Sequence, residues 1–456
     1  MTSLTCKRLS CFLFFTFSLF ALNAQLKLSG QLRTRSELRD GQGSPLPKDS
    51  SAAFFTSQRT RVSLEYDAYR LRFGLTVQDA RVWGQDGSTI NRTTTADNNG
   101  LMIHEAWAEI MFTDTTNKKQ QLSLKIGRQE LIYDDQRLIG NLDWLQQARR
   151  HDAAVFRFNT AKWQADAGFA FNQNKEKANG TGYNPTITGN YTGNTNGGSN
   201  YKSFEYFYAK RKLNKGALSF LFFADQFSKY QMDEINNVPV KQFGAGSWSR
   251  FTTGFYLNNK FDRLLLTAAA YYQGGRTAAG QNLSATLLSA GLLYDFGKKF
   301  NAGPGIDFTS GGSSGNTSHA FDPLYGTPHK FWGLMDYFYA ANGFGNKGLV
   351  DYYVRANWLP AARLKTTLDL HQFISASLVR DADNNSLSRN FGTEADLVCS
   401  YSFTRQIGFE AGYSHYFSSA TLSSPQVKNV INARQNGNWA YLGINILISA
   451  GVGKAN

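Results

Sequence analysis

Residues 26–38 read LKLSGQLRTRSEL, and apolar and charged side chains alternate along them. Leu26 and Leu28 fall on one parity, whereas Arg33 and Arg35 fall on the other. Because successive side chains of a strand point to opposite faces, one face of this segment is apolar and the other is charged. A helix would scatter these charges around its axis. The stretch therefore predicts a β-strand with one apolar face.

Segments of about 9–13 residues with a similar pattern recur to the end of the chain, which is the length that a tilted transmembrane strand needs. We place them at 26–38, 57–67, 69–79, 102–112, 121–129, 152–159, 162–172, 201–212, 216–227, 249–259, 262–273, 283–296, 301–309, 348–358, 363–376, 391–402, 404–417 and 438–449. This gives about 18 strands, an even number, as expected for a single-chain bacterial barrel.

The connections between these segments alternate between long and short. The long connections include 130–151, 173–200 and 228–248, whereas Asp67-Ala68 is a tight turn. Short periplasmic turns and long extracellular loops are typical of outer-membrane barrels. The sequence therefore predicts an all-β, transmembrane antiparallel barrel with both chain ends in the periplasm. We expect the Gly- and Asn-rich segment 180–200 to be exposed at the cell surface.

The amino terminus has the features of a secretory signal peptide. Lys7 and Arg8 precede an apolar run that ends at Leu22, and Ala24-Gln25 is the expected cleavage point. We therefore divide the chain into a signal peptide, 1–24, and an outer-membrane barrel, 25–456. The mature part keeps one cysteine, so it has no internal disulfide, and it has no apolar stretch long enough for a transmembrane helix.

The arginines of the predicted strands gather on the parity that faces away from lipid. An arginine on the lipid face would cost roughly 2–4 kcal/mol at the bilayer midplane. The residues on this charged parity are Arg33, Arg35, Arg59, Arg61, Arg70, Arg72, Arg250, Arg263 and Arg355. Acidic residues such as Glu37 share the parity, so one interpretation is a lumen filled by ion pairs. The net charge of +14 favours a second interpretation, a cationic conduit that is selective for anions.

Two blocks of sequence resemble the alginate export family of outer-membrane barrels. The first is LKIGRQELIYDDQRLIGNLDWLQQARRHDAAVFRF, residues 124–158, in which a strand ending in Gly-Arg-Gln leads to an Asp-rich loop, a DQR element, a Trp and a basic pair. The second is FDPLYGTPHKFWGLMDYF, residues 321–338. The opening R-x-R-x-E of 33–37 is also similar to the family.

The resemblance implies an 18-stranded barrel that passes an anionic exopolysaccharide through an arginine-lined constriction. It assigns the pore lining to Arg33, Arg35, Arg61 and Arg128. It also implies that the loop carrying Asp134, Asp135, Arg137 and Arg149 folds into the lumen as a gate.

We find no motif that indicates an enzyme. Asp134-Asp135 could be an acid–base pair or a calcium site, but a salt bridge to Arg137 is the simpler interpretation. Ser414 and His415 are neighbours on a strand and point to opposite faces, so they cannot form a nucleophile–base pair. With one mature cysteine there is no zinc spacing. We therefore expect no catalytic residue, no metal and no cofactor.

The sequence thus predicts a channel in the outer membrane of a Gram-negative cell, and the family resemblance implies that its function is export of an acidic exopolysaccharide. The expected partners are an anionic polysaccharide or a small anion, outer-membrane lipid, and a periplasmic export scaffold, but not nucleic acid. An alternative is a general anion-selective porin for passive uptake. Alternatives of another class are an outer-membrane enzyme and a plugged structural or adhesive barrel.

Overall fold

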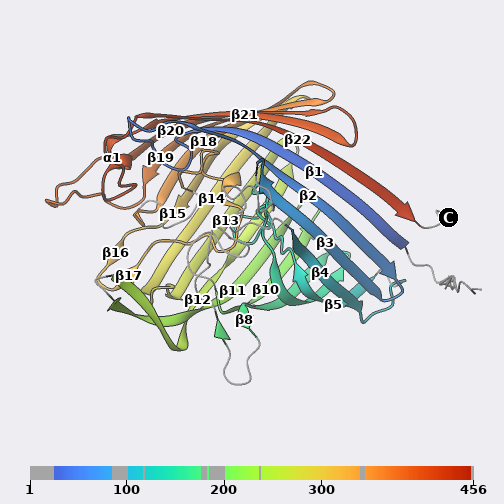
Figure 1. Ribbon diagram of the computed structural model, residues 1–456. Coiled ribbons are helices and arrows are strands. Elements are labelled where there is room, and N and C mark those ends of the chain that lie inside the picture. Colours follow the sequence, from blue (N-terminus) through green and yellow to red (C-terminus); the bar gives the residue numbers. More distant parts are fainter. Residues whose placement is uncertain are drawn as a thin grey trace, which may run out of the picture.

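The computed structural model describes residues 25–84, 101–116, 119–175, 182–183, 201–235, 238–338 and 345–452. The predicted signal peptide, 1–24, lies outside these residues, as does most of the segment 180–200, so both expectations stay predictions. Nearly all the regular elements of the described chain are β-strands, and they wrap around a central axis (Figure 1).

Twenty strands form one sheet, of which 18 form the barrel and two, β16 (Ser313–Ser314) and β17 (Thr317–Ser318), form a short hairpin. Each barrel strand is antiparallel to its neighbours, and β1 pairs with β22 to close the ring. The predicted 18-stranded antiparallel barrel is confirmed. The barrel strands are β1 (Gln25–Asp40), β2 (Ala53–Ala68), β3 (Leu71–Val82), β4 (Met102–Met111), β5 (Gln120–Gln129), β6 (His151–Thr160), β7 (Trp163–Phe171), β10 (Ser203–Leu213), β11 (Gly216–Ile235), β12 (Val238–Phe261), β13 (Leu264–Arg276), β14 (Asn282–Gly297), β15 (Phe300–Thr309), β18 (Leu349–Ala361), β19 (Leu364–Ser375), β20 (Asn390–Ser402), β21 (Ile407–Ser418) and β22 (Asn436–Val452).

The alternation of side chains decides which face of each strand meets lipid. Leu28 on β1 and Val62 on β2 are 47% and 52% exposed on the outer face, whereas Arg59 on β2 is 1% exposed. A closed ladder pairs the backbone groups of every strand, which hydrocarbon requires because it offers no hydrogen bonds. The outer face is therefore an apolar belt, and polar side chains collect inside the barrel.

The two ends of the barrel differ in the length of their connections. Residues 69–70 join β2 to β3, and 298–299 join β14 to β15. At the opposite end, 130–150 join β5 to β6, and 310–348 join β15 to β18. In outer-membrane barrels the short turns face the periplasm. β1 begins and β22 ends at this periplasmic end (Figure 1).

The predicted loop 228–248 is wrong, because most of it is β-structure. Strands β11 and β12 continue beyond the ends of their neighbours β10 and β13 as a two-stranded ribbon, in which Tyr230 pairs with Phe243. The register shifts just before this pair, which accommodates extra residues in β12. Ring contacts of Tyr230 with Phe243 (5.9 Å between centroids) and Trp248 (5.2 Å) stabilise the ribbon.

The remaining elements are short: β8 (Gln173–Lys175), β9 (Gly182–Tyr183), the 3-10 helix η1 (Pro328–Lys330) and the helix α1 (Ala420–Ser423). Among the described residues, no helix has both the length and the apolar character needed to cross a membrane.

Candidate functional site

The loop 130–150, which we call the first inner loop, lies inside the barrel. Its Asp143 carboxylate contacts Arg59 on β2, whereas its Asp134 carboxylate accepts hydrogen bonds from Tyr208 on β10 (2.6 Å) and Ser219 on β11 (2.7 Å). Strands β2 and β11 are far apart around the ring. A single loop can contact both from the inside only, so the first inner loop crosses the lumen.

Residues 321–338, the second inner loop, lie against the first. The Tyr325 amide donates to the Leu138 carbonyl (2.9 Å), and the Gly140 amide donates to the Tyr325 carbonyl (3.0 Å). At its far end, the Met335 amide donates to the Glu394 carboxylate of β20 (2.7 Å). The two inner loops therefore form one hydrogen-bonded unit that narrows the barrel. The conformation of neither loop could be predicted from the local sequence.

Gly326 lies where the two inner loops are closest. A Cβ atom placed on Gly326 would lie 2.0 Å from the Arg137 carbonyl oxygen, which is backbone and cannot rotate away. We expect Gly326→Val to separate the two inner loops and to increase single-channel conductance in planar bilayers. The control is Gly244→Val, because a Cβ atom at Gly244 has no neighbour within 4 Å. Unchanged conductance in Gly326→Val would show that the two inner loops do not limit the passage.

Three arginines of β1 and β2 converge on one carboxylate of the first inner loop. Asp143 lies 3.1 Å from Arg33, 2.7 Å from Arg59 and 3.4 Å from Arg61. Burial alone would raise the pKa of Asp143, but the guanidinium groups, Arg59 first, outweigh burial and lower it. Asp143 is therefore a carboxylate at neutral pH, and it clamps the loop to the basic wall.

Arg35 extends this cluster toward the second inner loop. Its guanidinium lies 3.8 Å from the centre of the Trp144 ring, and the imidazole of His329 stacks on Trp144 at 4.2 Å. The Trp144 carbonyl accepts from both Arg35 (2.7 Å) and Arg33 (3.5 Å). Trp144 thus joins the basic wall to both inner loops.

The acidic groups do not balance this cluster. Five guanidinium groups, those of Arg33, Arg35, Arg39, Arg59 and Arg61, share three carboxylates, those of Glu37, Glu130 and Asp143. We call these eight residues the basic cluster. Its net charge of +2 is concentrated at one wall of the narrowed lumen.

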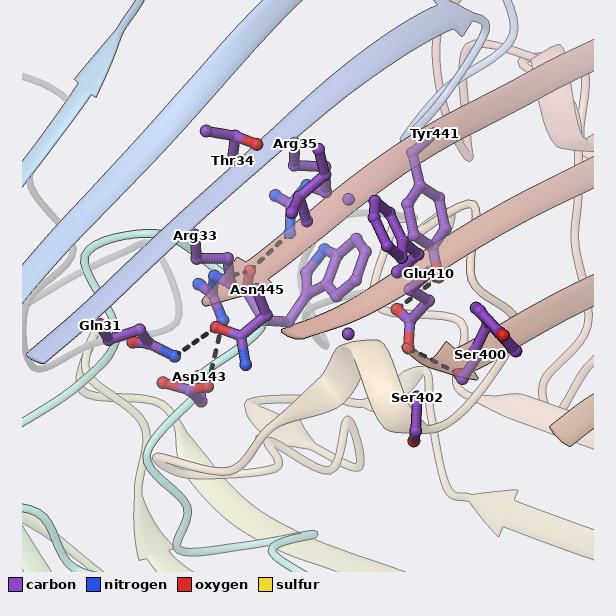
Figure 2. Close-up of a pocket in the computed structure, with 16 residues that line it drawn as sticks. Gln31, Arg33, Thr34, Arg35, Asp143, Ser400, Ser402, Glu410, Tyr441 and Asn445 are labelled. Carbon is purple, nitrogen blue, oxygen red and sulfur yellow. Dashed lines mark hydrogen bonds and ion pairs between the residues drawn. The ribbon is translucent and has the colours of Figure 1, made fainter. Parts of the chain in front are cut away.

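A cavity of about 320 Å³ adjoins the basic cluster on the side of the periplasmic turns. Figure 2 shows Arg33, Arg35 and Asp143 beside this space, with Glu410 across from them. Glu410 accepts hydrogen bonds from Ser400 (3.0 Å) and Tyr441 (2.9 Å). One side of the cavity is therefore cationic. On the opposite side, the Glu410 carboxylate is held by the neutral hydroxyl groups of Ser400 and Tyr441.

A second cavity, of about 240 Å³, lies between the inner loops and strands β12 to β19. Arg137 of the first inner loop and Arg355 of β18 line it. Arg137 pairs with Asp307 (2.7 Å), and Arg355 pairs with Asp369 (2.6 Å). Each of these arginines is neutralised by its own carboxylate. This wall therefore fits the interpretation of a lumen filled by ion pairs better than the basic cluster does.

The predicted arginines differ widely in what they contact. Arg35, Arg59, Arg137 and Arg149 are buried, and Arg149 donates to the Gly326 carbonyl of the second inner loop. Arg72 is 53% exposed and pairs with Asp67 (3.1 Å). Arg250 is buried between Asp225 (2.6 Å) and Asp322 (3.0 Å). Many of these arginines therefore hold the inner loops or neighbouring strands in place.

Arg128 does not lie on the inner face where the family resemblance placed it. It shares the parity of Ile126, which is 49% exposed on the outer face, and it pairs with Asp152 of β6 (2.8 Å). The outer position is tolerated because the pair lies at the extracellular end of both strands and the acid offsets the charge. Arg128 is therefore part of the outer rim.

Arg70 and Arg263 lie in turns, outside the strands in which the sequence placed them. β3 begins at Leu71, and Arg70 has a positive φ of 60°. β13 begins at Leu264, after Asp262 with φ of 51°. The alternating pattern continues through a two-residue turn, so parity alone cannot show where a strand begins.

Sequence reasoning missed Asp143, which lies at the centre of the contacts just described. Its neighbour Trp144 belongs to the block that resembles a known family, and this adjacency was the available signal. Asp134 and Asp135 are held by Tyr208, Ser219 and Arg137. In the part of the chain that the structure describes, no group of His, Cys, Asp or Glu side chains is arranged to hold a metal ion.

Comparisons with known proteins agree with this architecture. A family model described as alginate export matches residues 24–433. No curated protein matches the chain by sequence. The fold is similar to that of OccAB4 from Acinetobacter baumannii, at TM-score 0.59 and 12% identity over 93% of this chain and 98% of that chain. It is also similar to a BenF-like porin from Pseudomonas fluorescens Pf-5, at TM-score 0.57 and 10% identity over 94% and 99%. OpdQ from Pseudomonas aeruginosa follows at TM-score 0.54 and 13% identity over 94% and 98%.

Proposed function

The chain belongs to the alginate export family and is an outer-membrane channel, and from this premise we propose that its lumen selects anions and exports an acidic exopolysaccharide. The proposal has two parts that can fail separately. The first is the sign of the charge that passes, and the second is the polymeric nature of the cargo.

The basic cluster is the observation that carries the first part. Its positive excess lies where the inner loops narrow the barrel, and a narrow passage with low-dielectric walls concentrates the field of such charges. Arg33 and Arg61 keep 16% and 14% of their side chains exposed, so solvent in the passage reaches them. A passing anion would exchange water for these guanidinium donors, whereas a cation would be repelled.

The neutral hydrogen-bonding groups around the first cavity support a carbohydrate cargo. Gln31 and Asn445 are hydrogen-bonded to each other (2.8 Å), and Ser400 and Ser402 also line the space (Figure 2). Amides and hydroxyls beside cationic groups suit a chain of sugars that bear carboxylates. The porin-like fold of the structural neighbours also supports a second candidate, passive uptake of small anions.

Block of the ionic current by oligosaccharides tests the proposal. Oligogalacturonates of defined length should interrupt the current through single channels in planar bilayers, because their carboxylates bind the basic cluster. Neutral dextrans of matched length should interrupt it at least tenfold less often at the same concentration. Equal block by both would contradict a charge-selective polymer channel, and a protein that inserts without conducting would favour a plugged structural barrel.

A further inference from the structure

The eight short turns at the periplasmic end share one feature that the lumen does not explain. Each carries at least one exposed basic residue. These residues, which we call the periplasmic ring, are Arg70, Lys119, Lys162, Lys215, Arg263, Lys298, Lys299, Arg363 and Arg405. They come from all eight periplasmic turns, which join 16 of the 18 barrel strands, so they lie around most of the mouth.

The two ends of the barrel are charged very differently. The described residues of the eight short turns include the nine basic residues of the periplasmic ring and two acidic residues, Asp114 and Asp262. The described connections at the extracellular end are much longer, yet they contain 12 basic and nine acidic residues. The excess of basic over acidic residues is therefore greater in the periplasmic turns than in the extracellular connections, although the periplasmic turns contain far fewer residues.

Several members of the periplasmic ring have no acidic partner in the described part of the chain. Lys162, Lys215 and Arg405 are exposed and form no ion pair there. Because isolated surface cations interact weakly with the fold, their charge remains available to a ligand.

Neighbouring strand ends direct further cations toward the mouth. Lys212 has the parity of Tyr208, which contacts the first inner loop, and Lys365 has the parity of the buried Asp369. Both lysines are exposed and thus lie on the inner side of the rim. This placement favours a ligand at the mouth of the pore over lipid head groups outside it.

The spacing of the turns indicates the kind of anion. With strands about 4.8 Å apart and tilted by about 40°, adjacent hairpins are about 12 Å apart around the rim. This distance exceeds the Debye length of about 8 Å at physiological ionic strength, so a small anion interacts with one turn at a time. A flexible polyanion can contact several turns at once, and its binding is then multivalent.

We propose that the periplasmic ring captures a soluble polyanion at the periplasmic mouth and delivers it to the basic cluster. This rests on the proposed function, because capture has a purpose if the lumen carries anions. The periplasmic ring also gives transport a direction, because it raises the rate at which the polyanion enters the pore from the periplasmic side. Electrostatic focusing of this kind increases association rates by about 10-fold to 1000-fold and weakens as salt is added.

The test compares entry from the two sides of oriented channels. Orientation is assigned with Ser51→Cys in a Cys399→Ser background, because Ser51 is exposed on an extracellular loop and its biotinylation can be read with streptavidin. Long polygalacturonate is added to one side, and the frequency of current blocks is measured. The ring variant carries Lys162→Gln, Lys215→Gln, Lys298→Gln and Arg405→Gln, and the control carries Lys48→Gln, Lys229→Gln, Lys241→Gln and Arg380→Gln at the extracellular end.

We expect blocks of the unmodified channel to be at least tenfold more frequent from the periplasmic side at 0.1 M salt. The ring variant should lose this difference, whereas the control should keep it, and the reversal potential in a KCl gradient should stay the same in both. Equal block frequencies from the two sides of the unmodified channel would overturn the proposal. So would a ring variant that changes insertion into phosphatidylglycerol bilayers but not block frequency, because the ring would then serve lipid. If the unmodified channel showed no preference for anions, that result would instead overturn the proposed function.

Discussion

Replacing Asp143 with asparagine is expected to raise single-channel conductance several-fold and to strengthen anion preference. The Asp143 carboxylate contacts Arg33, Arg59 and Arg61, and Arg59 is almost fully buried. Losing a charged acceptor beside a buried guanidinium costs about 1–3 kcal/mol, and here that cost falls on the docking of the first inner loop. The loop should leave the basic wall more often, and the wall should also lose one of its three acids.

Single-channel recording of Asp143→Asn in a KCl gradient measures both effects. Asp295→Asn is the matched control, since Asp295 also pairs with a cation, Lys260 (2.6 Å), but next to a periplasmic turn. We expect the control to behave like the unmodified channel. If Asp143→Asn has unchanged conductance and unchanged selectivity, the first inner loop does not gate the passage.

Replacing Arg33 and Arg61 together with glutamate is expected to reverse the selectivity of the channel from anions to cations. These two arginines have the exposed guanidinium surface nearest the first inner loop, and the double substitution changes the charge of the basic cluster by −4. With a starting net charge of +2, the cluster becomes negative. Arg35 is left in place because it is buried against Trp144 and Glu37, where a change would disturb packing.

The sign of the reversal potential in a KCl gradient is the readout, because loosening of the loop could alter conductance without altering sign. Arg33→Gln with Arg61→Gln should give an intermediate, weakly selective channel. Arg128→Gln is the control, because Arg128 faces outward and should leave selectivity unchanged. A persistent anion preference in the double glutamate variant would place the selective charges elsewhere.

Alternation along the strands predicted the barrel well, because lipid penalises any break in the pattern. Leu28 faces out and Arg59 faces in, as their parity requires. Arg128 was misplaced by resemblance, although its own parity with Leu122 and Ile126 indicated the outer face. The local pattern was more reliable there than the analogy.

The inner loops could not be predicted in the same way. Their positions depend on contacts between residues far apart in sequence, such as Asp143 with Arg33 and Met335 with Glu394. No periodicity marks such contacts, because the loops use turns and positive φ values instead of a repeating face. The ribbon of β11 and β12 was missed for a related reason: strand pairing beyond the membrane needs no apolar face.

The most direct measurement of the central claim is the reversal potential of the unmodified channel between 0.1 M and 1 M KCl. A basic cluster with a net charge of +2, placed where the inner loops narrow the lumen, predicts that chloride carries most of the current. A potassium-selective channel would contradict the account, because the guanidinium groups would then not govern what passes.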